Sequence, residues 1–184
     1  MASGMGTRFG GNKLMAKLDG APLIQHVIQA TEKHFEKRVV VTHHNDVAKL
    51  CHALGAEVTL HKKPHRNDTV RLGMDATSEC DTVTFFQADQ PLISPSTITA
   101  LLCAAENNPE YIWRASFEGA PGAPVLFPSW TFDELRTLPS GKGGGYVAKA
   151  HEKLVRTIEV SNRWELFDVD TPEDLILLQK HSGL

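Results

Sequence analysis

The sequence predicts a single-domain α/β protein with a mainly parallel, layered sheet. Short runs rich in β-branched and aromatic residues alternate with longer segments of helical periodicity along all 184 residues, which is the pattern of strand–helix–strand units. Apolar residues make up 41% of the chain, enough to bury one sizeable core at this length. No repeat, composition shift or linker divides the chain, so we expect residues 1–184 to form one domain.

The expected strands are bounded by polar and glycine-containing segments. The stretch RVVVT at 38–42 is a short, continuous β-branched run, as expected of a strand that is buried on both faces. The other expected strands cover residues 57–60, 82–87, 111–117, 123–127, 153–160 and 165–169.

Helices are expected where apolar residues recur every three or four positions. Several of them carry a recognisable start or stop: Asn45 and Ser94 are candidate N-caps, Gly55 is a stop, and Thr171 with Asp174 forms a capping-box pattern. The expected helices cover residues 21–37, 45–55, 69–77, 94–107, 129–138 and 171–180.

Composition excludes several classes of protein. The net charge of −3 and the lack of a long basic run argue against nucleic acid as the main partner. The sequence contains no run of about 18 apolar residues, the length needed to span a membrane. Its glycine-rich start does not resemble a secretory signal. Cys51, Cys80 and Cys103 are widely spaced and odd in number. We therefore expect reduced, core-packing thiols in a cytoplasmic protein.

The opening stretch MASGMGTRFGGNKL combines glycines with two cations. It misses the dinucleotide pattern G-x-G-x-x-G, because Gly10 comes one residue late and no acid follows the next strand. It also misses G-x-x-x-x-G-K-[ST], since Asn12 separates the second glycine from the lysine. The pattern G-x-G-x-R-x-G-x-x-K is filled at every position, by Gly4, Gly6, Arg8, Gly10 and Lys13.

A loop of this composition can hold a triphosphate. Glycines let backbone N–H groups approach the phosphates closely. Arg8 can bind phosphate oxygens with its planar fork, and Lys13 adds a second cation where the charge of pyrophosphate develops. The alternative is a flexible glycine-rich terminus whose cations are incidental.

The loop and four later stretches together resemble the nucleotidyltransferase superfamily of the glycosyltransferase-A type fold. The four stretches are HRNDTVRLGM at 65–74, FFQADQPLIS at 85–94, GAPVLFP at 122–128 and LFDVDTPEDL at 166–175. Gln90 and the NDTVRLG and PVLFP segments look most similar to molybdenum cofactor cytidylyltransferases. The resemblance implies a three-layer α/β/α sandwich with a Rossmann-like nucleotidyltransferase fold and a mixed, mainly parallel sheet.

The same resemblance implies a reaction. CMP would pass from CTP to molybdopterin with release of pyrophosphate, Mg²⁺ would be the cofactor, and a molybdenum hydroxylase apoprotein is a candidate partner. The residues suit this chemistry, which needs positioning and charge neutralisation rather than a covalent nucleophile. Two alternatives stay open: guanylyl or sugar-phosphate transfer on the same fold, and a nucleotide- or cofactor-binding accessory protein without turnover.

Arg8, Lys13 and Asp89 are the expected catalytic residues. Asp89 follows an apolar strand and precedes Pro91, so it is well placed to bind Mg²⁺, although it could merely cap a turn. Asp168 and Asp170 alternate at the end of an expected strand and would face the same side. Asp170 is the second expected metal ligand, and the alternative is that it belongs to the turn that starts the last helix.

Nucleotide contacts are expected from two segments. In the opening loop they come from Ala2, Ser3, Gly4, Met5, Gly6 and Lys13. In the segment HRNDTVRLG, the resemblance implies recognition of the base and ribose by Asn67 and Thr69, with a helix cap as the alternative for Thr69. His61 and His65 stand four residues apart, but Pro64 interrupts a helix between them, so we do not expect a zinc site.

Two features depart from the family pattern. The turn PSGKGGGYV has Gly141 and Gly145 where pterin-linked members often carry Asp and Arg, and Lys142 is its only charge. The sequence also begins where the first, central strand of the family would end, and losing a central strand would leave two unpaired ladders. An upstream start is the expectation we favour over a sheet that closes across the gap or an impaired protein.

Overall fold

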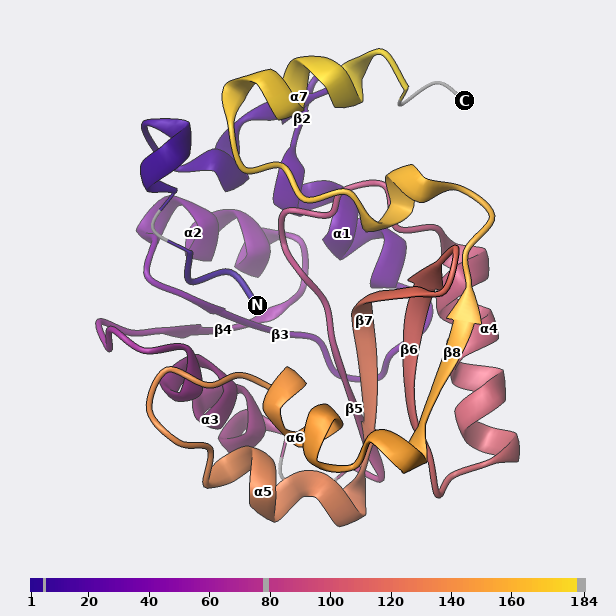
Figure 1. The fold of residues 1–184 in the computed structure, drawn as a ribbon. Coiled ribbons are helices and arrows are strands. Elements are labelled where there is room, and N and C mark those ends of the chain that lie inside the picture. Colours follow the sequence, from indigo (N-terminus) through magenta and orange to yellow (C-terminus); the bar gives the residue numbers. More distant parts are fainter. Residues whose placement is uncertain (5, 78–79, 182–184) are drawn as a thin grey trace.

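A computed structural model describes residues 1–4, 6–77 and 80–181. Over these residues a twisted sheet lies between two layers of helices (Figure 1). The α/β/α sandwich with a mixed sheet that the sequence predicts is therefore confirmed. Among the described residues, no helix is long and apolar enough to cross a membrane.

The strands of the sheet fall into two hydrogen-bonded groups. In the first, β3 (Val39–Thr42) and β4 (Glu57–Leu60) pair in parallel. In the second, the order is β5 (Thr82–Phe85), β7 (Ala120–Pro128), β6 (Ile112–Phe117) and β8 (Val155–Glu159). β7 runs antiparallel to β5 and β6, whereas β6 and β8 are parallel. A separate short hairpin pairs β1 (Lys17–Leu18) with β2 (Ala21–Pro22).

Met1 and Ala2 connect the two groups of strands. Ala2 forms a parallel bridge with Thr42 at the end of β3. On the other side, the amino group of Met1 donates to the carbonyl of Phe86 at 2.9 Å, and the Met1 carbonyl accepts from Ala88 N at 3.3 Å. The described residues contain no further strand between β3 and β5. The opening loop is thus anchored to the sheet by its first two residues.

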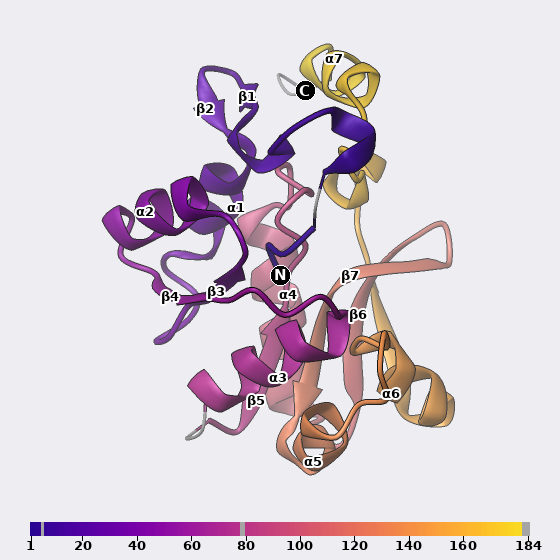
Figure 2. The ribbon, with the colours of Figure 1, turned by 90° about the vertical axis from the view of Figure 1, so that its left-hand side faces the viewer.

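The helices form one layer on each face of the sheet (Figure 2). One layer contains α1 (Leu23–Thr31), α2 (Asn45–Ala53) and α4 (Pro95–Asn107). The other contains α3 (Arg66–Ala76), α5 (Phe132–Arg136) and α6 (Gly145–Ala150). The strands separate these layers because alternate side chains face opposite ways. Accordingly, Leu126 packs with α4, whereas Val125 and Phe127 pack with α3, α5 and α6.

The last helix, α7 (Pro172–Gln179), packs beside the β1–β2 hairpin at one edge of the molecule (Figure 1). It starts with the predicted capping box, in which Thr171 and Asp174 bond each other's backbone N–H groups. The predicted cap of α4 is also present, since Ser94 Oγ accepts from Thr97 N at 3.1 Å. Asn45 is not a cap but the first residue of α2, whose N-cap position is His44.

Residues 165–169 do not form the predicted strand. Arg163–Leu166 is a 3₁₀ helix, and no regular element follows it before α7. The cause is the buried carboxylate of Glu165, which accepts from Ser94 N at 3.0 Å and Thr97 Oγ1 at 2.7 Å. A charge-assisted contact of this kind with the start of a helix is favourable, and it holds the segment against α4 instead of in the sheet.

Candidate active site

A cavity of about 1220 Å³ opens beyond the carboxyl ends of β3 and β5 and extends over the sheet toward β6 and β7. Its walls come from segments far apart in the sequence: the opening loop, the start of α3, residues 85–90, the β6–β7 hairpin, the turn at 143–145 and residues 163–170. The crevice at the carboxyl ends of the strands is where open α/β sheets bind ligands.

Lys13 lies at the centre of a cluster of four charged residues in this cavity. Its ammonium is 2.6 Å from Oδ2 of Asp89 and 2.8 Å from Oδ1 of Asp170. Arg8 binds the other oxygen of Asp170 at 2.8 Å. Lys13 is only 8% exposed. The structure therefore brings together the two cations and two carboxylates that the sequence selected.

The cluster stabilises the charged forms of Lys13 and Asp170. Burial works against the charge of Lys13, but the hydrogen bonds to Asp170 and Asp89 outweigh it and raise the pKa of Lys13 above its ordinary value. The hydrogen bond from Lys13 in turn lowers the pKa of Asp170. Opposite charges within hydrogen-bond distance thus stabilise the ammonium of Lys13 and the carboxylate of Asp170.

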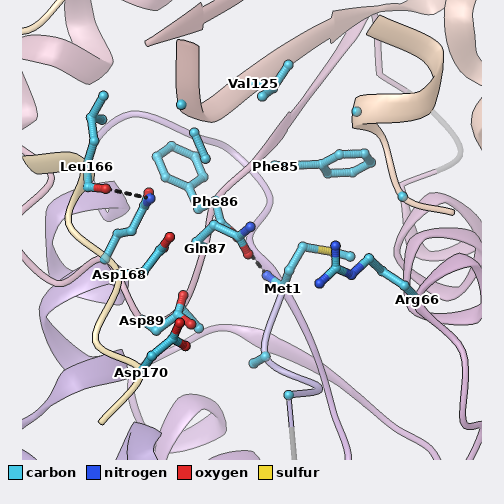
Figure 3. A pocket seen from close by; sticks show the side chains of 18 of the residues that line it. Met1, Arg66, Phe85, Phe86, Gln87, Asp89, Val125, Leu166, Asp168 and Asp170 are labelled. Carbon is cyan, nitrogen blue, oxygen red and sulfur yellow. Dashed lines mark hydrogen bonds between the residues drawn. The ribbon is translucent and has the colours of Figure 1, made fainter. Parts of the chain in front are cut away.

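A third carboxylate lies beside this cluster. Figure 3 shows Asp89, Asp168 and Asp170 gathered at one end of the cavity. The hydrogen bond from Val169 N to the Asp89 carbonyl, at 3.0 Å, places the flanking residues Asp168 and Asp170 there without a strand. Burial, aided by the charge of Asp89, raises the pKa of Asp168. Gln90 braces the same segment, because its Nε2 donates to the Leu166 carbonyl at 3.1 Å.

The opening loop is held in a fixed conformation by its neighbours. Ser3 Oγ lies 3.0 Å from the carbonyl of Val41 and 2.9 Å from Nε2 of His61. Gly6 has a φ of +61°, and a Cβ there would collide with the carbonyl oxygen of Gly11. The glycine is thus required by backbone conformation and by space.

Most, but not all, of the residues predicted to contact the nucleotide line the cavity. Ala2, Ser3, Gly4, Gly6, Lys13 and Thr69 line the cavity, and Met5 lies outside the described residues. Asn67 is not part of the lining, and its Oδ1 accepts from Gly141 N at 3.0 Å. In the structure, Asn67 therefore holds the glycine-rich turn.

The glycine-rich turn at 141–145 packs tightly against the rings of Phe85 and Phe127. A Cβ on Gly144 would lie 3.0 Å from the ring of Phe85 and 3.1 Å from the ring of Phe127. A Cβ on Gly143 would lie 3.1 Å from Cδ of Arg66. The close approach explains why small residues occur at these two positions, which the sequence analysis did not select.

Two further lining residues, Arg66 and Arg114, were also missed. Arg66 starts α3, and Figure 3 shows its side chain extending toward Met1. Arg114 belongs to β6, whose sequence IWRASF is otherwise free of charge. A charged residue inside an apolar strand was the signal available in the sequence, because such a residue is seldom buried without a partner.

The acidic residues suit a divalent cation that a nucleotide helps to coordinate. Among the described residues, no group of three or more His, Cys, Asp and Glu side chains could form a complete metal site. Mg²⁺ commonly binds through one or two carboxylates together with substrate phosphates and water. Asp89 and Asp170 are hard oxygen donors that both contact the Lys13 ammonium, so the donor set fits this ion.

The phosphate-type loop, the paired carboxylates and the crevice at the strand ends define a nucleotide-binding α/β protein. The family model of the MobA-like NTP transferase domain matches residues 1–155, and the chain belongs to this family.

Known proteins are similar to this chain in sequence or in structure. A 3-deoxy-manno-octulosonate cytidylyltransferase of Pasteurella multocida is 34% identical over 104 residues, a match that covers 54% of this chain and 39% of that protein. The chain thus matches about two fifths of the length of this curated relative. Among solved structures, Rv0371c of Mycobacterium tuberculosis has a TM-score of 0.84 at 19% identity, and the match covers 97% of this chain and 95% of the Rv0371c chain. A CMP:2-keto-3-deoxy-manno-octonic acid synthetase complexed with CTP has a TM-score of 0.72 at 18% identity, covering 94% and 92% of the two chains.

Proposed function

We propose that this protein is a Mg²⁺-dependent cytidylyltransferase that transfers CMP from CTP to molybdopterin and releases pyrophosphate. The observation that carries the proposal is the cluster of Lys13, Asp89 and Asp170, which joins the phosphate-type loop to the acidic end of a large cavity. Cytidylyl transfer is supported by the curated relative, which is a cytidylyltransferase. A cytoplasmic location and a molybdenum hydroxylase apoprotein as recipient of the product belong to the same proposal.

Each charged residue has a role in this reaction. Arg8 and Lys13 bind the phosphates of CTP and stabilise the charge that develops on the leaving pyrophosphate. Asp89 and Asp170 would hold Mg²⁺, which would supply Lewis-acid polarisation of the phosphate oxygens. An acceptor phosphate oxygen attacks the α-phosphorus, and the bond to the oxygen bridging the α- and β-phosphates breaks. That oxygen leaves with the bonding electron pair as part of pyrophosphate.

The opening loop and α3 serve the nucleotide in this proposal. Backbone N–H groups of Ser3, Gly4 and Gly6 face the phosphates, as in other anion-binding loops. The N–H of Ala2 donates to the Val41 carbonyl at 3.1 Å, so Ala2 serves the nucleotide by lining the cavity and anchoring the loop. Thr69 lies at the cavity wall and contacts the nucleoside. Asn67 acts indirectly, because its hydrogen bond to Gly141 positions the turn whose residues 143–145 line the cavity.

The floor of the cavity favours a flat acceptor. Phe85 and Val125 line it, and the ring of Phe127, which is itself fully buried, packs against that of Phe85 with 5.3 Å between centroids. Aromatic and apolar surfaces contribute most when they cover a planar ring. A pterin ring fits this floor better than a sugar that carries many hydroxyl groups.

A sugar acid is the second candidate acceptor. It is favoured by the identity to 3-deoxy-manno-octulosonate cytidylyltransferases, which reaches 34% in two curated relatives. In that case, the CMP transfer and the roles of Lys13, Asp89 and Asp170 stay the same, and only the acceptor differs.

The test is release of pyrophosphate from CTP and Mg²⁺ with molybdopterin or a 3-deoxy sugar acid as acceptor, repeated with GTP. We expect turnover with CTP and molybdopterin, and a loss of about 100-fold or more in Asp89→Asn. Asp133→Asn is the matched control, because the Asp133 side chain is fully exposed on α5, away from the cavity lining.

Three results would contradict the proposal. Unchanged turnover in Asp89→Asn would remove the metal role of this residue. Turnover with GTP and none with CTP would indicate guanylyl transfer. CTP binding without pyrophosphate release from either acceptor would favour a nucleotide-binding accessory protein.

A further inference from the structure

Arg114 places a positive charge in the apolar floor of the cavity. It lies on β6 in register with Val125 of β7, and Val125 is in register with Phe85 of β5. Directly paired residues share a face of the sheet. The three side chains therefore form a row across three strands, and all three line the cavity.

The guanidinium of Arg114 is fixed in place but not neutralised. Its Nε and Nη2 both donate to the carbonyl of Gly122, at 3.1 and 2.9 Å. Among the described residues, Arg114 forms no ion pair, and its Nη1 has no hydrogen-bond partner. The side chain is half-buried, and burial lowers the pKa of Arg114. A desolvated cation without a counter-ion is costly, so an anionic ligand would bind here favourably.

A chain of contacts links Arg114 to the acidic end of the cavity. A Cβ on Gly122 would lie 3.0 Å from Cδ1 of Leu166, so the backbone that accepts from Arg114 abuts this leucine. The Leu166 carbonyl accepts from Gln90, which directly follows Asp89. A molecule that covers Phe85 and Val125 would therefore lie in the same cavity as both Asp89 and Arg114.

We propose that Arg114 binds an anionic group, a carboxylate or a phosphate, on an acceptor whose flat body covers Phe85 and Val125. The planar fork of a guanidinium suits either anion, since it can donate two parallel hydrogen bonds. The proposal rests on the proposed function, because the acceptor is the second substrate of that reaction. The proposal adds that the site should bind anionic ring compounds more tightly than neutral ones.

Direct binding of three pterins tests this selectivity without turnover. The probes are 6-hydroxymethylpterin, which is neutral, its phosphate monoester and pterin-6-carboxylate, titrated by their own fluorescence in the absence of CTP. The protein should bind at least one of the two anions about tenfold or more tightly than the neutral compound. The preferred anion identifies the group that Arg114 binds.

Three variants distinguish two roles of Arg114: binding an anion, and only holding the Gly122 backbone in place. Arg114→Gln keeps a donor for the Gly122 carbonyl but loses the charge, and it should bind the three pterins with similar affinity. Arg114→Lys should keep part of the preference, since it retains the charge without the fork. Arg156→Met is the matched control: Arg156 also donates to backbone carbonyls but lies outside the cavity lining, so the preference should remain.

Equal binding of all three pterins, no binding of either anion, or a full preference in Arg114→Gln would overturn the proposal. Thermal unfolding of each variant checks that the fold is intact. These outcomes differ from failure of the proposed function. An anion preference without pyrophosphate release would keep the Arg114 site and discard the transferase, whereas turnover without the preference would do the opposite.

Discussion

The ammonium of Lys13 lies 2.6 Å from Oδ2 of Asp89, which joins the opening loop to the segment after β5. The same ammonium is 2.8 Å from Oδ1 of Asp170, just before α7. One cation thus occupies the position between two carboxylates that would share a metal ion. The loop, the carboxylates and the segment before α7 form one electrostatic unit, so a change in one member affects the others.

Replacing Lys13 by methionine should separate metal binding from nucleotide binding. Without the ammonium, Asp89 and Asp170 repel each other, and Mn²⁺ alone should bind more tightly than in the unchanged protein. Affinity for CTP should fall by about tenfold or more, because a charge-assisted phosphate contact is lost. Titration of Mn²⁺ by electron paramagnetic resonance and of CTP by calorimetry measures both effects.

Lys49→Met is the control for this experiment, since Lys49 is exposed on α2 and lies outside the cavity lining. It should change neither affinity. Weaker Mn²⁺ binding in Lys13→Met would show that the lysine does not compete with the metal.

Replacing Gly144 by alanine should lower the free energy of unfolding by about 1–3 kcal/mol, the usual cost of overpacking. The new methyl group would lie 3.0–3.1 Å from the rings of Phe85 and Phe127. Gly145→Ala is the matched control, because nothing lies within 4 Å of its Cβ position and it begins α6. Alanine there should leave stability unchanged or raise it. Urea unfolding compares the two variants, and equal stabilities would contradict the close packing of the turn.

His61 should make stability depend on pH. Its Nδ1 accepts from Lys63 N at 3.2 Å, so in the neutral ring Nε2 carries the proton and donates to Ser3 Oγ at 2.9 Å. Burial, reinforced by His43, lowers the pKa of His61 below its ordinary 6.5. The unfolded chain then binds a proton more readily than the folded one. The contribution of His61 is therefore present above pH 6.5 and is lost as pH falls through the lower, folded pKa.

Urea unfolding at several pH values between about 5 and 8 measures this dependence. His61→Gln should reduce the loss of stability on the acid side, whereas His52→Gln, at an exposed position of α2, should not. An identical pH profile in His61→Gln and the unchanged protein would exclude the role of this histidine.

The three cysteines should react with iodoacetamide at different rates. Cys51 is fully buried, as expected from the sequence, and Cys80 is partly buried. Cys103 is exposed, so the expectation that it packs in the core was wrong. Burial raises the pKa of Cys51 to about 11, which leaves little thiolate at pH 8. Mass spectrometry of peptides should show Cys103 modified first and Cys51 last, and Cys103→Ser should remove the fast phase. Equal rates for Cys51 and Cys103 would contradict the packing of α2.

Sequence patterns predicted most elements because their signals are local. The β-branched run of β3, the caps at Ser94 and Thr171 and the stop at Gly55 each depend on residues within one or two turns. The segment 165–169 was misassigned because its conformation depends on a distant partner: Glu165 reaches the start of α4. Such a contact leaves no trace in the periodicity of the segment itself.

The sequence by itself determined the sandwich, the phosphate-type loop and the chemical types of Arg8, Lys13, Asp89 and Asp170. Only the tertiary structure decided which of these charges meet, because their contacts span up to 162 residues of chain. It also showed Asn67 hydrogen-bonded to the glycine-rich turn and Arg114 on the cavity floor. Local patterning determines where strands and helices form, whereas the packing of whole layers determines which side chains share a cavity.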